Sequence, residues 1–291
     1  MKRAAFAPLA ACLALSVVAG GDARTSGLPQ VPRFSSAVEA VRVDVLVTAG
    51  GRPVRGLTAG DFEVLDNGVR QTVDVAAFAQ PLNVILALDM SASVAGARLS
   101  DLQRAIRMVL GDLRGGDRAA LLQFSHMVTL AADLTGDVER VGSVVDRLTG
   151  RGETALVDGA YAALLLGEQD AGRSLVMIFS DGLDTSSWLT PGAVVSIARR
   201  SDVVAYAVST GGPAPPFLRD LAETTGGRSI DLSSTKALSE TFVGILDEFR
   251  GRYVLGFTPQ GTARGGWHRL QVRVKGRSVS VRARPGYQSS R

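Results

Sequence analysis

Asn83-Val84-Ile85-Leu86-Ala87-Leu88-Asp89-Met90-Ser91-Ala92-Ser93 is the stretch of sequence that decides the fold. From Val84 to Leu88 it is continuously apolar, which is typical of a parallel strand buried on both faces. The run ends at Asp89, and Ser91 and Ser93 follow at alternating positions. One carboxylate and two hydroxyls on a short turn are hard oxygen ligands that suit magnesium. The alternative is a strand end whose polar residues cap the next helix.

The segment 81–250 alternates between apolar strands and amphipathic helices. This rhythm predicts an α/β fold with a doubly wound, mostly parallel sheet. Further strands are predicted at 118–124, 174–180, 203–209 and 229–232. Helices are predicted by apolar residues at helical spacing around 102–113, 138–148, 155–166, 192–200, 217–224 and 238–249.

The segments 37–80 and 251–291 alternate with a period of two instead. Asp66-Asn67-Gly68 predicts a tight hairpin in the first segment. Each flank has too few and too short strands to form a stable layer alone. We therefore expect the two flanks to pair into one β-domain, with the α/β unit inserted between them.

The amino terminus predicts export. Met1-Lys2-Arg3, an apolar centre and small residues near Gly20 are typical of a signal peptide over residues 1–23, followed by a linker over 24–36. An uncleaved membrane anchor and lipidation at Cys12 are the alternatives. After cleavage the chain has no cysteine and no transmembrane span, so it is expected to be periplasmic, cell-surface or secreted.

Charge does not point to nucleic acid. The formal net charge is +4 and the pI is about 9.6. However, the arginines are scattered along the chain rather than gathered in a block. We expect no nucleic-acid partner.

Oxygen-bearing side chains follow the central strands. In an open α/β sheet, ligands bind beyond the carboxyl ends of the strands, where Asp89 and Asp181 are expected. Thr154 begins a helix from a glycine-flanked loop that could reach the same edge. Magnesium takes six oxygens. If hydroxyls bind it directly and carboxylates bind it through water, one position stays open for a partner's Asp or Glu carboxylate.

These motifs resemble the metal-ion-dependent adhesion site of the von Willebrand factor A domain family. The resemblance rests on Asp89-Met90-Ser91-Ala92-Ser93, Glu153-Thr154-Ala155-Leu156 and Ser180-Asp181-Gly182. The flanks, including Asp66-Asn67-Gly68 and Arg284-Pro285-Gly286-Tyr287, resemble bacterial secreted proteins related to that family. The resemblance implies direct metal ligation by Ser91, Ser93 and Thr154, and water-mediated ligation by Asp89 and Asp181. Glu153 and Gly159 depart from the family, which more often has Gly and Ala at these positions.

Three further residues are candidates for a binding rim. Trp188 follows Asp181 in a loop and is either an aromatic contact for a partner or a packing residue. Asp184 either tunes the metal site or is a solvated loop acid. Glu153 adds charge beside Thr154.

The expected function is an extracytoplasmic, metal-dependent protein-binding or adhesion module that is not an enzyme. Magnesium is the expected cation, with calcium or manganese as alternatives. A structural envelope protein with a loop-bracing metal is one alternative function. A metal-dependent hydrolase is another, but it needs a positioned base, and the sequence places hydroxyls without histidine or lysine near the proposed metal. A zinc site would need clustered His, Cys or acid ligands, and the two histidines, His126 and His268, lie on segments far apart in the sequence.

Overall fold

The computed structural model describes residues 40–73, 75–77, 80–170 and 172–289. The predicted signal peptide (1–23) and linker (24–36), with Cys12, lie outside the described residues. All described helices and strands belong to one compact unit, Val38–Arg291. Within the described ranges, we find no helix with the length and apolar character needed to cross a bilayer.

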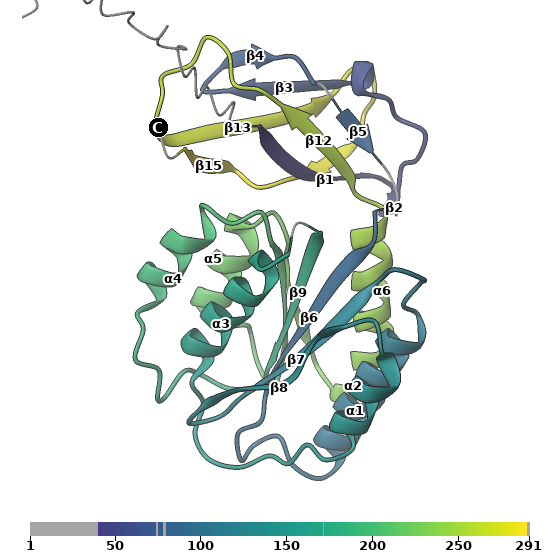
Figure 1. The fold of residues 1–291 in the computed structure, drawn as a ribbon, viewed down its shortest axis with the longest axis vertical. Helices are drawn as coiled ribbons and strands as arrows, with labels where there is room; N and C mark the ends of the chain where they lie inside the picture. The colour runs from purple at the N-terminus through teal and green to yellow at the C-terminus, as the bar shows by residue number, and fades with distance from the viewer. Residues whose placement is uncertain (1–39, 74, 78–79, 171, 290–291) are drawn as a thin grey trace, which may run out of the picture. The chain divides into compact units, whose positions relative to one another are not determined.

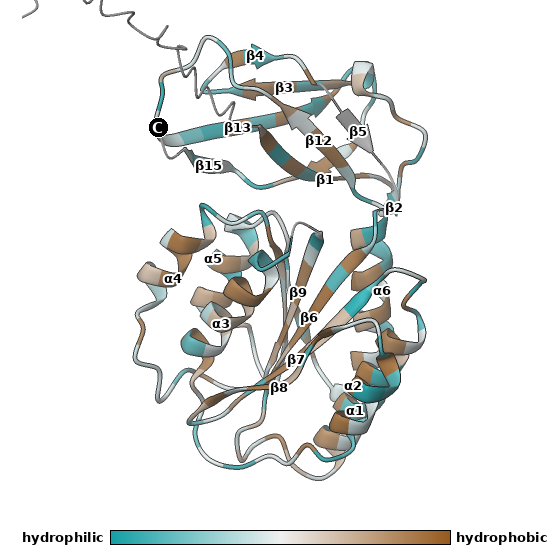
Figure 2. Ribbon diagram, viewed as in Figure 1, coloured by the Kyte–Doolittle hydropathy of each residue, from teal (hydrophilic) through white to brown (hydrophobic). Residues whose placement is uncertain are grey.

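A six-stranded sheet lies at the centre of the α/β part (Figure 1). Its strand order is β11-β10-β9-β6-β7-β8, and all neighbours are parallel except β7 and β8. The two central strands, β6 (Leu82–Asp89) and β9 (Arg173–Ser180), are buried along their whole length. Figure 2 shows their apolar character. The other strands are β7 (Arg118–Phe124), β8 (Val128–Thr135), β10 (Val204–Thr210) and β11 (Ser229–Leu232).

Helices cover both faces of this sheet because alternate residues of each strand point to opposite sides. Leu86 and Leu88 pack into the core on one face, and Ile85 and Ala87 pack into the core on the other. The first face carries α1 (Ala97–Gly111), α2 (Val138–Val145) and α6 (Leu238–Arg250), and the second carries α3 (Leu156–Glu168), α4 (Pro191–Ala198) and α5 (Pro216–Thr224). The predicted doubly wound α/β architecture is confirmed.

The edge strand β8 is not predicted by the sequence pattern. It pairs with β7 in the antiparallel direction, with register shifts near Leu121. Only Ala132 of its eight residues is buried. An edge strand with one buried residue has neither an apolar run nor a clear alternation, so periodicity cannot reveal it.

The two ends of the chain form two antiparallel sheets together. In the first sheet, β1 (Val41–Ala49) pairs with β12 (Tyr253–Phe257) and β14 (Ser280–Arg282). In the second, β13 (Gly266–Val274) pairs with β3 (Phe62–Asp66) and β15 (Gly286–Ser289). The remaining strands are β2 (Arg52–Pro53), β4 (Val69–Gln71) and β5 (Val75–Ala77). Both sheets need strands from both ends, which confirms the predicted pairing of the flanks.

The predicted hairpin joins β3 to β4. Asn67 and Gly68 have φ angles of 48° and 84°, as the two central residues of a type I′ turn require. The short strand β15 is not predicted, since the sequence pattern beyond residue 282 has no clear alternation.

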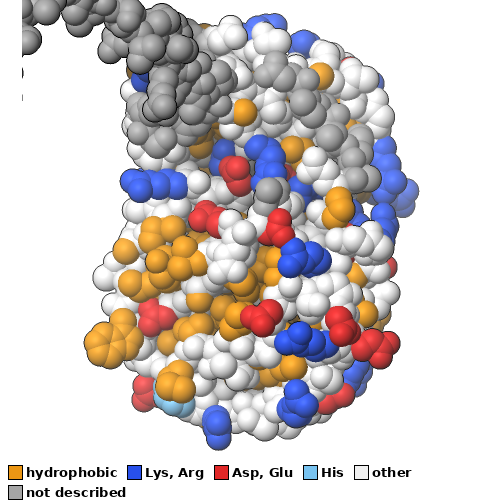
Figure 3. Space-filling model, viewed as in Figure 1, with side chains coloured by type: hydrophobic (Ala, Val, Ile, Leu, Met, Phe, Trp, Pro, Cys, Tyr) orange, Lys and Arg blue, Asp and Glu red, His pale blue; other side chains and the backbone are white. Residues whose placement is uncertain are grey.

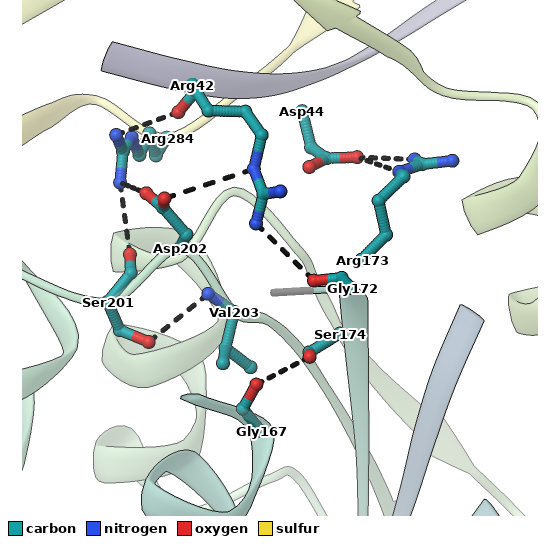
Figure 4. A network of polar contacts seen from close by, with 10 residues as sticks. All are labelled: Arg42, Asp44, Gly167, Gly172, Arg173, Ser174, Ser201, Asp202, Val203 and Arg284. Carbon is teal, nitrogen blue, oxygen red and sulfur yellow. Dashed lines mark hydrogen bonds and ion pairs between the residues drawn. The ribbon is translucent and has the colours of Figure 1, made fainter. Parts of the chain in front are cut away.

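A buried ion pair links the β-domain to the central sheet (Figure 4). Arg173, the first residue of β9, donates from Nε to Oδ1 of Asp44 on β1 at 3.0 Å, and both side chains are buried. The Arg173 guanidinium also lies over the ring of Phe249, 4.7 Å from its centroid. Nearby, Arg284 binds Asp202 at 3.0 Å and the carbonyl of Arg42 at 2.8 Å. These contacts hold β1 against the amino-terminal edge of the central sheet.

We expect Asp44→Ala to destabilise the protein strongly, because it leaves the Arg173 guanidinium buried without its counter-charge. Loss of one partner of a buried pair costs about 3–5 kcal/mol. The matched control is Asp146→Ala, which removes an exposed partner of Arg107 and should cost less than about 1 kcal/mol. Urea denaturation measures the free energy of unfolding of both variants. Equal decreases would show that the buried pair contributes no more to stability than the exposed one.

Candidate metal centre

Three segments meet at the carboxyl edge of the central sheet. The turn after β6 and the loop 150–154 are joined by Arg151 N–H to Met90 O at 2.7 Å and by Ala92 N–H to Gly152 O at 3.0 Å. Gly150 allows this approach, since a Cβ there would stand 2.0 Å from the carbonyl oxygen of Val94. The end of β9 lies beside the end of β6, with Leu88 opposite Phe179.

Four of the predicted site residues form one hydrogen-bonded chain. The hydroxyls of Ser91 and Ser93 are 2.9 Å apart, and Ser93 Oγ donates to Asp181 Oδ1 at 2.6 Å. Asp89 Oδ1 accepts the backbone N–H of Ser91 at 2.9 Å. Side chains that are 88 positions apart in the sequence therefore touch.

Thr154 lies beside the same group. It is buried, and its backbone N–H donates to Thr185 Oγ1 at 3.0 Å while its carbonyl accepts the N–H of Thr185 at 2.9 Å. Its own Oγ1 is 3.9 Å from the point where a Cβ on Gly182 would stand. The threonine hydroxyl thus lies next to the residue that follows Asp181.

Asp89 is fully buried at the end of the central strand. Burial raises the pKa of its carboxyl, and the nearby Asp181 carboxylate adds to the rise, although hydrogen bonds from Ser180 and Ser91 oppose it. Ser180 Oγ donates to Asp89 Oδ2 at 2.7 Å. Among the described residues, no ion pair to Asp89 is formed. A buried carboxylate with hydrogen bonds but no cation is a strong acceptor for positive charge.

Asp181 does have a basic partner, which no pattern in the sequence reveals. Arg98, the second residue of α1, places Nη1 2.7 Å from Asp181 Oδ2. The Asp181 side chain has 0% exposure, whereas that of Arg98 is 48% exposed. The guanidinium therefore shields the carboxylate from solvent on one side.

The donor set fits a hard divalent cation. It consists of three hydroxyls and two carboxylates, and the buried Asp89 charge is not neutralised by a neighbouring basic group. Within the described ranges, no three His, Cys, Asp or Glu side chains gather, so the site is unlike a histidine- and cysteine-rich zinc centre. Ser91, Ser93 and Thr154 are the residues that could hold a magnesium-like ion directly, with the acids in support.

The rim candidates have different surroundings. Trp188 is 93% exposed, so the packing alternative is wrong for this residue. Its backbone N–H donates to Oδ2 of Asp158 in α3 at 3.0 Å. This hydrogen bond anchors the loop of Trp188 to α3. Asp184 is exposed in its loop, and its Oδ1 also accepts the N–H of Val157 at 3.2 Å in the first turn of α3. Glu153 is exposed beside Thr154.

The structure explains two residues whose roles the sequence does not reveal. His126 lies closer than its sequence position suggested, because a Cβ on Gly152 would stand 2.7 Å from its Nδ1. Its ring nitrogen is 3.4 Å from Ser125 Oγ. Gly159 replaces the usual alanine because the ring of Phe124 fills the space, 2.5 Å from where a Cβ would stand.

Comparison with known proteins agrees with the fold. The family model described as "von Willebrand factor type A domain" matches residues 83–243. The solved von Willebrand factor type A structure from Catenulispora acidiphila has a TM-score of 0.55 at 14% identity, covering 84% of this chain and 75% of that chain.

A second similar structure is proximal thread matrix protein 1 from the mussel byssus, solved with a zinc-occupied MIDAS motif. Its TM-score is 0.54 at 18% identity, and the match covers 62% of this chain and 48% of that chain. This chain thus spans about half the length of the mussel protein. At these identities, both structures establish the shared fold.

We predict that Asp89→Asn raises the melting temperature in EDTA at neutral pH. Since the folded pKa of Asp89 is raised, its ionised form costs stability above that pKa, and protonation as the pH falls removes the cost. Asparagine keeps the acceptor for Ser91 N–H and can donate to Ser180 Oγ, so it removes the charge alone. If the gain is about 1 kcal/mol, the melting temperature rises by about 2–4 °C.

Asp89→Ala is the matched control, because it removes the charge together with both hydrogen bonds. It should not raise the melting temperature. Calorimetry in EDTA measures both variants, and a lower melting temperature for Asp89→Asn would show that the ionised carboxylate stabilises the fold.

Proposed function

Because this chain belongs to the von Willebrand factor type A domain family, we propose that it is a metal-dependent protein-binding module that acts outside the cytoplasm. Domains of this family are typically non-catalytic adhesion modules that bind protein ligands. In our proposal, a divalent cation is held directly by three hydroxyls and through water by two carboxylates. These residues are Ser91, Ser93, Thr154, Asp89 and Asp181.

The observation that carries the proposal is the hydrogen-bonded group at the carboxyl edge. It joins the Ser91 and Ser93 hydroxyls to Asp181 and leaves the fully buried Asp89 without a basic partner among the described residues. A purely structural strand end would not need a buried, unpaired carboxylate, which costs free energy. A cation bound next to Asp89 would offset this cost.

Magnesium is the cation we propose, because hydroxyl and carboxylate oxygens are hard ligands, with calcium or manganese as alternatives. Direct ligation by neutral hydroxyls leaves most of the cation's charge uncompensated, so the cation can attract a further anionic ligand. An Asp or Glu carboxylate from a partner protein is the complementary ligand. Export of the chain, to the periplasm, the cell surface or the medium, is supported by the signal-peptide pattern of residues 1–23.

The loops around the site expose large apolar side chains to a partner. Trp188, Leu183 and Met127 are 93%, 68% and 63% exposed, which makes them the most exposed large hydrophobic residues described. Two follow β9, and Met127 lies in the turn between β7 and β8. On the face shown in Figure 3, hydrophobic side chains also gather over the region of α3 and α4. We propose that Trp188 contacts the partner beside the cation.

A hydrolytic function has less support. Hydrolysis needs a base near the reacting group. His126 lies against Gly152, but its ring contacts Ser125 rather than a hydroxyl or carboxylate of the proposed site. We therefore propose binding without catalysis.

The test is a pull-down from envelope extract with the purified chain as bait, in magnesium and in EDTA. We expect a set of proteins that is retained in magnesium and lost both in EDTA and with Asp89→Ala. Asp146→Ala, which changes an exposed acid at the end of α2, should behave like the wild type.

Two results would contradict the proposal. Partners that survive both EDTA and Asp89→Ala would show binding that does not depend on a metal. Magnesium that raises the melting temperature while retaining no partner would support the alternative of a structural protein with a loop-bracing cation.

Trp188→Ser should weaken partner retention without changing magnesium binding. The side chain is 93% exposed and its loop is anchored through the backbone, so the substitution should leave the fold intact. Loss of an aromatic anchor typically weakens binding by about 2 kcal/mol or more. The control is Met108→Ser, which changes another exposed apolar residue, 48% exposed, on α1. If Trp188→Ser retains the partner as well as the wild type does, Trp188 does not contact the partner.

A further inference from the structure

The ion pair between Arg98 and Asp181 places a permanent positive charge inside the candidate metal site. Arg98 Nη1 lies 2.7 Å from Asp181 Oδ2 and 3.4 Å from the carbonyl oxygen of Ser93. Ser93 Oγ donates a hydrogen bond of 2.6 Å to Oδ1, the other carboxylate oxygen of Asp181. Both oxygens of this acid are therefore engaged, one by a neutral hydroxyl and one by a cation.

The position of Arg98 follows from the local sequence. The turn after Asp89 leads through Gly96, whose φ of 60° suits glycine, into α1. The first turn of α1 therefore returns beside Ser93, and the guanidinium reaches the end of β9. Other arginines of α1 point elsewhere, since Arg104 pairs with Asp101 and Arg107 with Asp146.

We propose that Arg98 is an internal counter-cation that lowers the affinity of the site for a divalent metal. This inference rests on the proposed function, because it assumes that Asp181 supports the cation. The guanidinium holds one oxygen of Asp181 and repels a second positive charge at the same short range. A bound cation must therefore share the acid with Arg98 or displace it.

The charges of the site support this assignment. Asp89 and Asp181 influence each other electrostatically, and Arg98 contacts only the second of them. Arginine stays charged at any physiological pH, so its effect on the site does not depend on titration. The result is a site in which the affinity for metal is set by a residue that is not itself a metal ligand.

The experiment is isothermal titration calorimetry with MgCl₂ and with MnCl₂ at constant ionic strength, using the purified chain. Arg98→Gln should lower the dissociation constant for both metals by about fivefold to tenfold, which corresponds to about 1–1.4 kcal/mol. Arg98→Lys keeps the positive charge and should remain within about twofold of the wild type. Arg104→Gln removes an exposed arginine on the same helix, outside the site, and should have no effect.

The outcomes separate this inference from the proposed function. If the wild type binds metal, Asp89→Ala does not, and Arg98→Gln binds as the wild type or more weakly, the counter-cation role is overturned while the metal site stands. Weaker binding by Arg98→Gln would instead make Arg98 a positioning residue for Asp181. If neither the wild type nor Arg98→Gln binds either metal, both proposals fail. Melting temperatures in EDTA confirm that each variant is folded.

Discussion

A carboxylate buried at the end of the central strand is the constraint on which the site depends. Asp89 is fully buried, and its hydrogen bonds come from the Ser91 backbone and the Ser180 hydroxyl. The first donor lies in the turn after β6 and the second is the last residue of β9, so β6 and β9 must lie side by side with the register that the sheet has. Such a group costs free energy in the folded state, and the fold offsets only part of that cost through hydrogen bonds. The site is therefore a place where function and stability oppose each other.

The same strand connects the site to the β-domain. Arg173 begins β9 and pairs with Asp44, whereas Asp181 directly follows the last residue of β9. Eight residues of extended chain span roughly 25 Å. The buried ion pair and the candidate metal site thus lie at opposite ends of one rigid element. This separation leaves the carboxyl edge of the sheet clear of the β-domain, as a docking surface for a partner requires.

Local patterns in the sequence predict what depends on local chemistry. The apolar runs of β6 and β9 reveal the central strands, and the spacing of Asp89, Ser91 and Ser93 reveals a cluster of oxygen-bearing side chains at the end of β6. The roles of Ser180 and Arg98 could not be predicted in this way. Their contacts join residues 91 and 83 positions apart in the sequence. Ser180 belongs to the motif Ser180-Asp181-Gly182, but no local pattern shows that its hydroxyl donates to Asp89 or that Arg98 pairs with Asp181. The hydrogen bond of Asp184 to the first turn of α3 could not be predicted either, because Val157 lies 27 positions earlier in the chain.

Of the two acids of the site only Asp181 has a basic partner, and this difference explains why a partner acid would complete the charge balance of the site. When both are ionised, Asp89 and Asp181 carry two negative charges, and Arg98 supplies one positive charge, so the charges of these three groups sum to −1. A divalent cation would bring the sum to +1, and the carboxylate of a partner would bring it to zero. Exposed Glu153 contributes less to this balance, because water and salt screen it. In a site without Arg98, the divalent cation would bring the summed charge of the site to zero, and the site would attract a partner acid less strongly. The arginine that weakens metal binding is therefore also the residue that leaves positive charge for the partner.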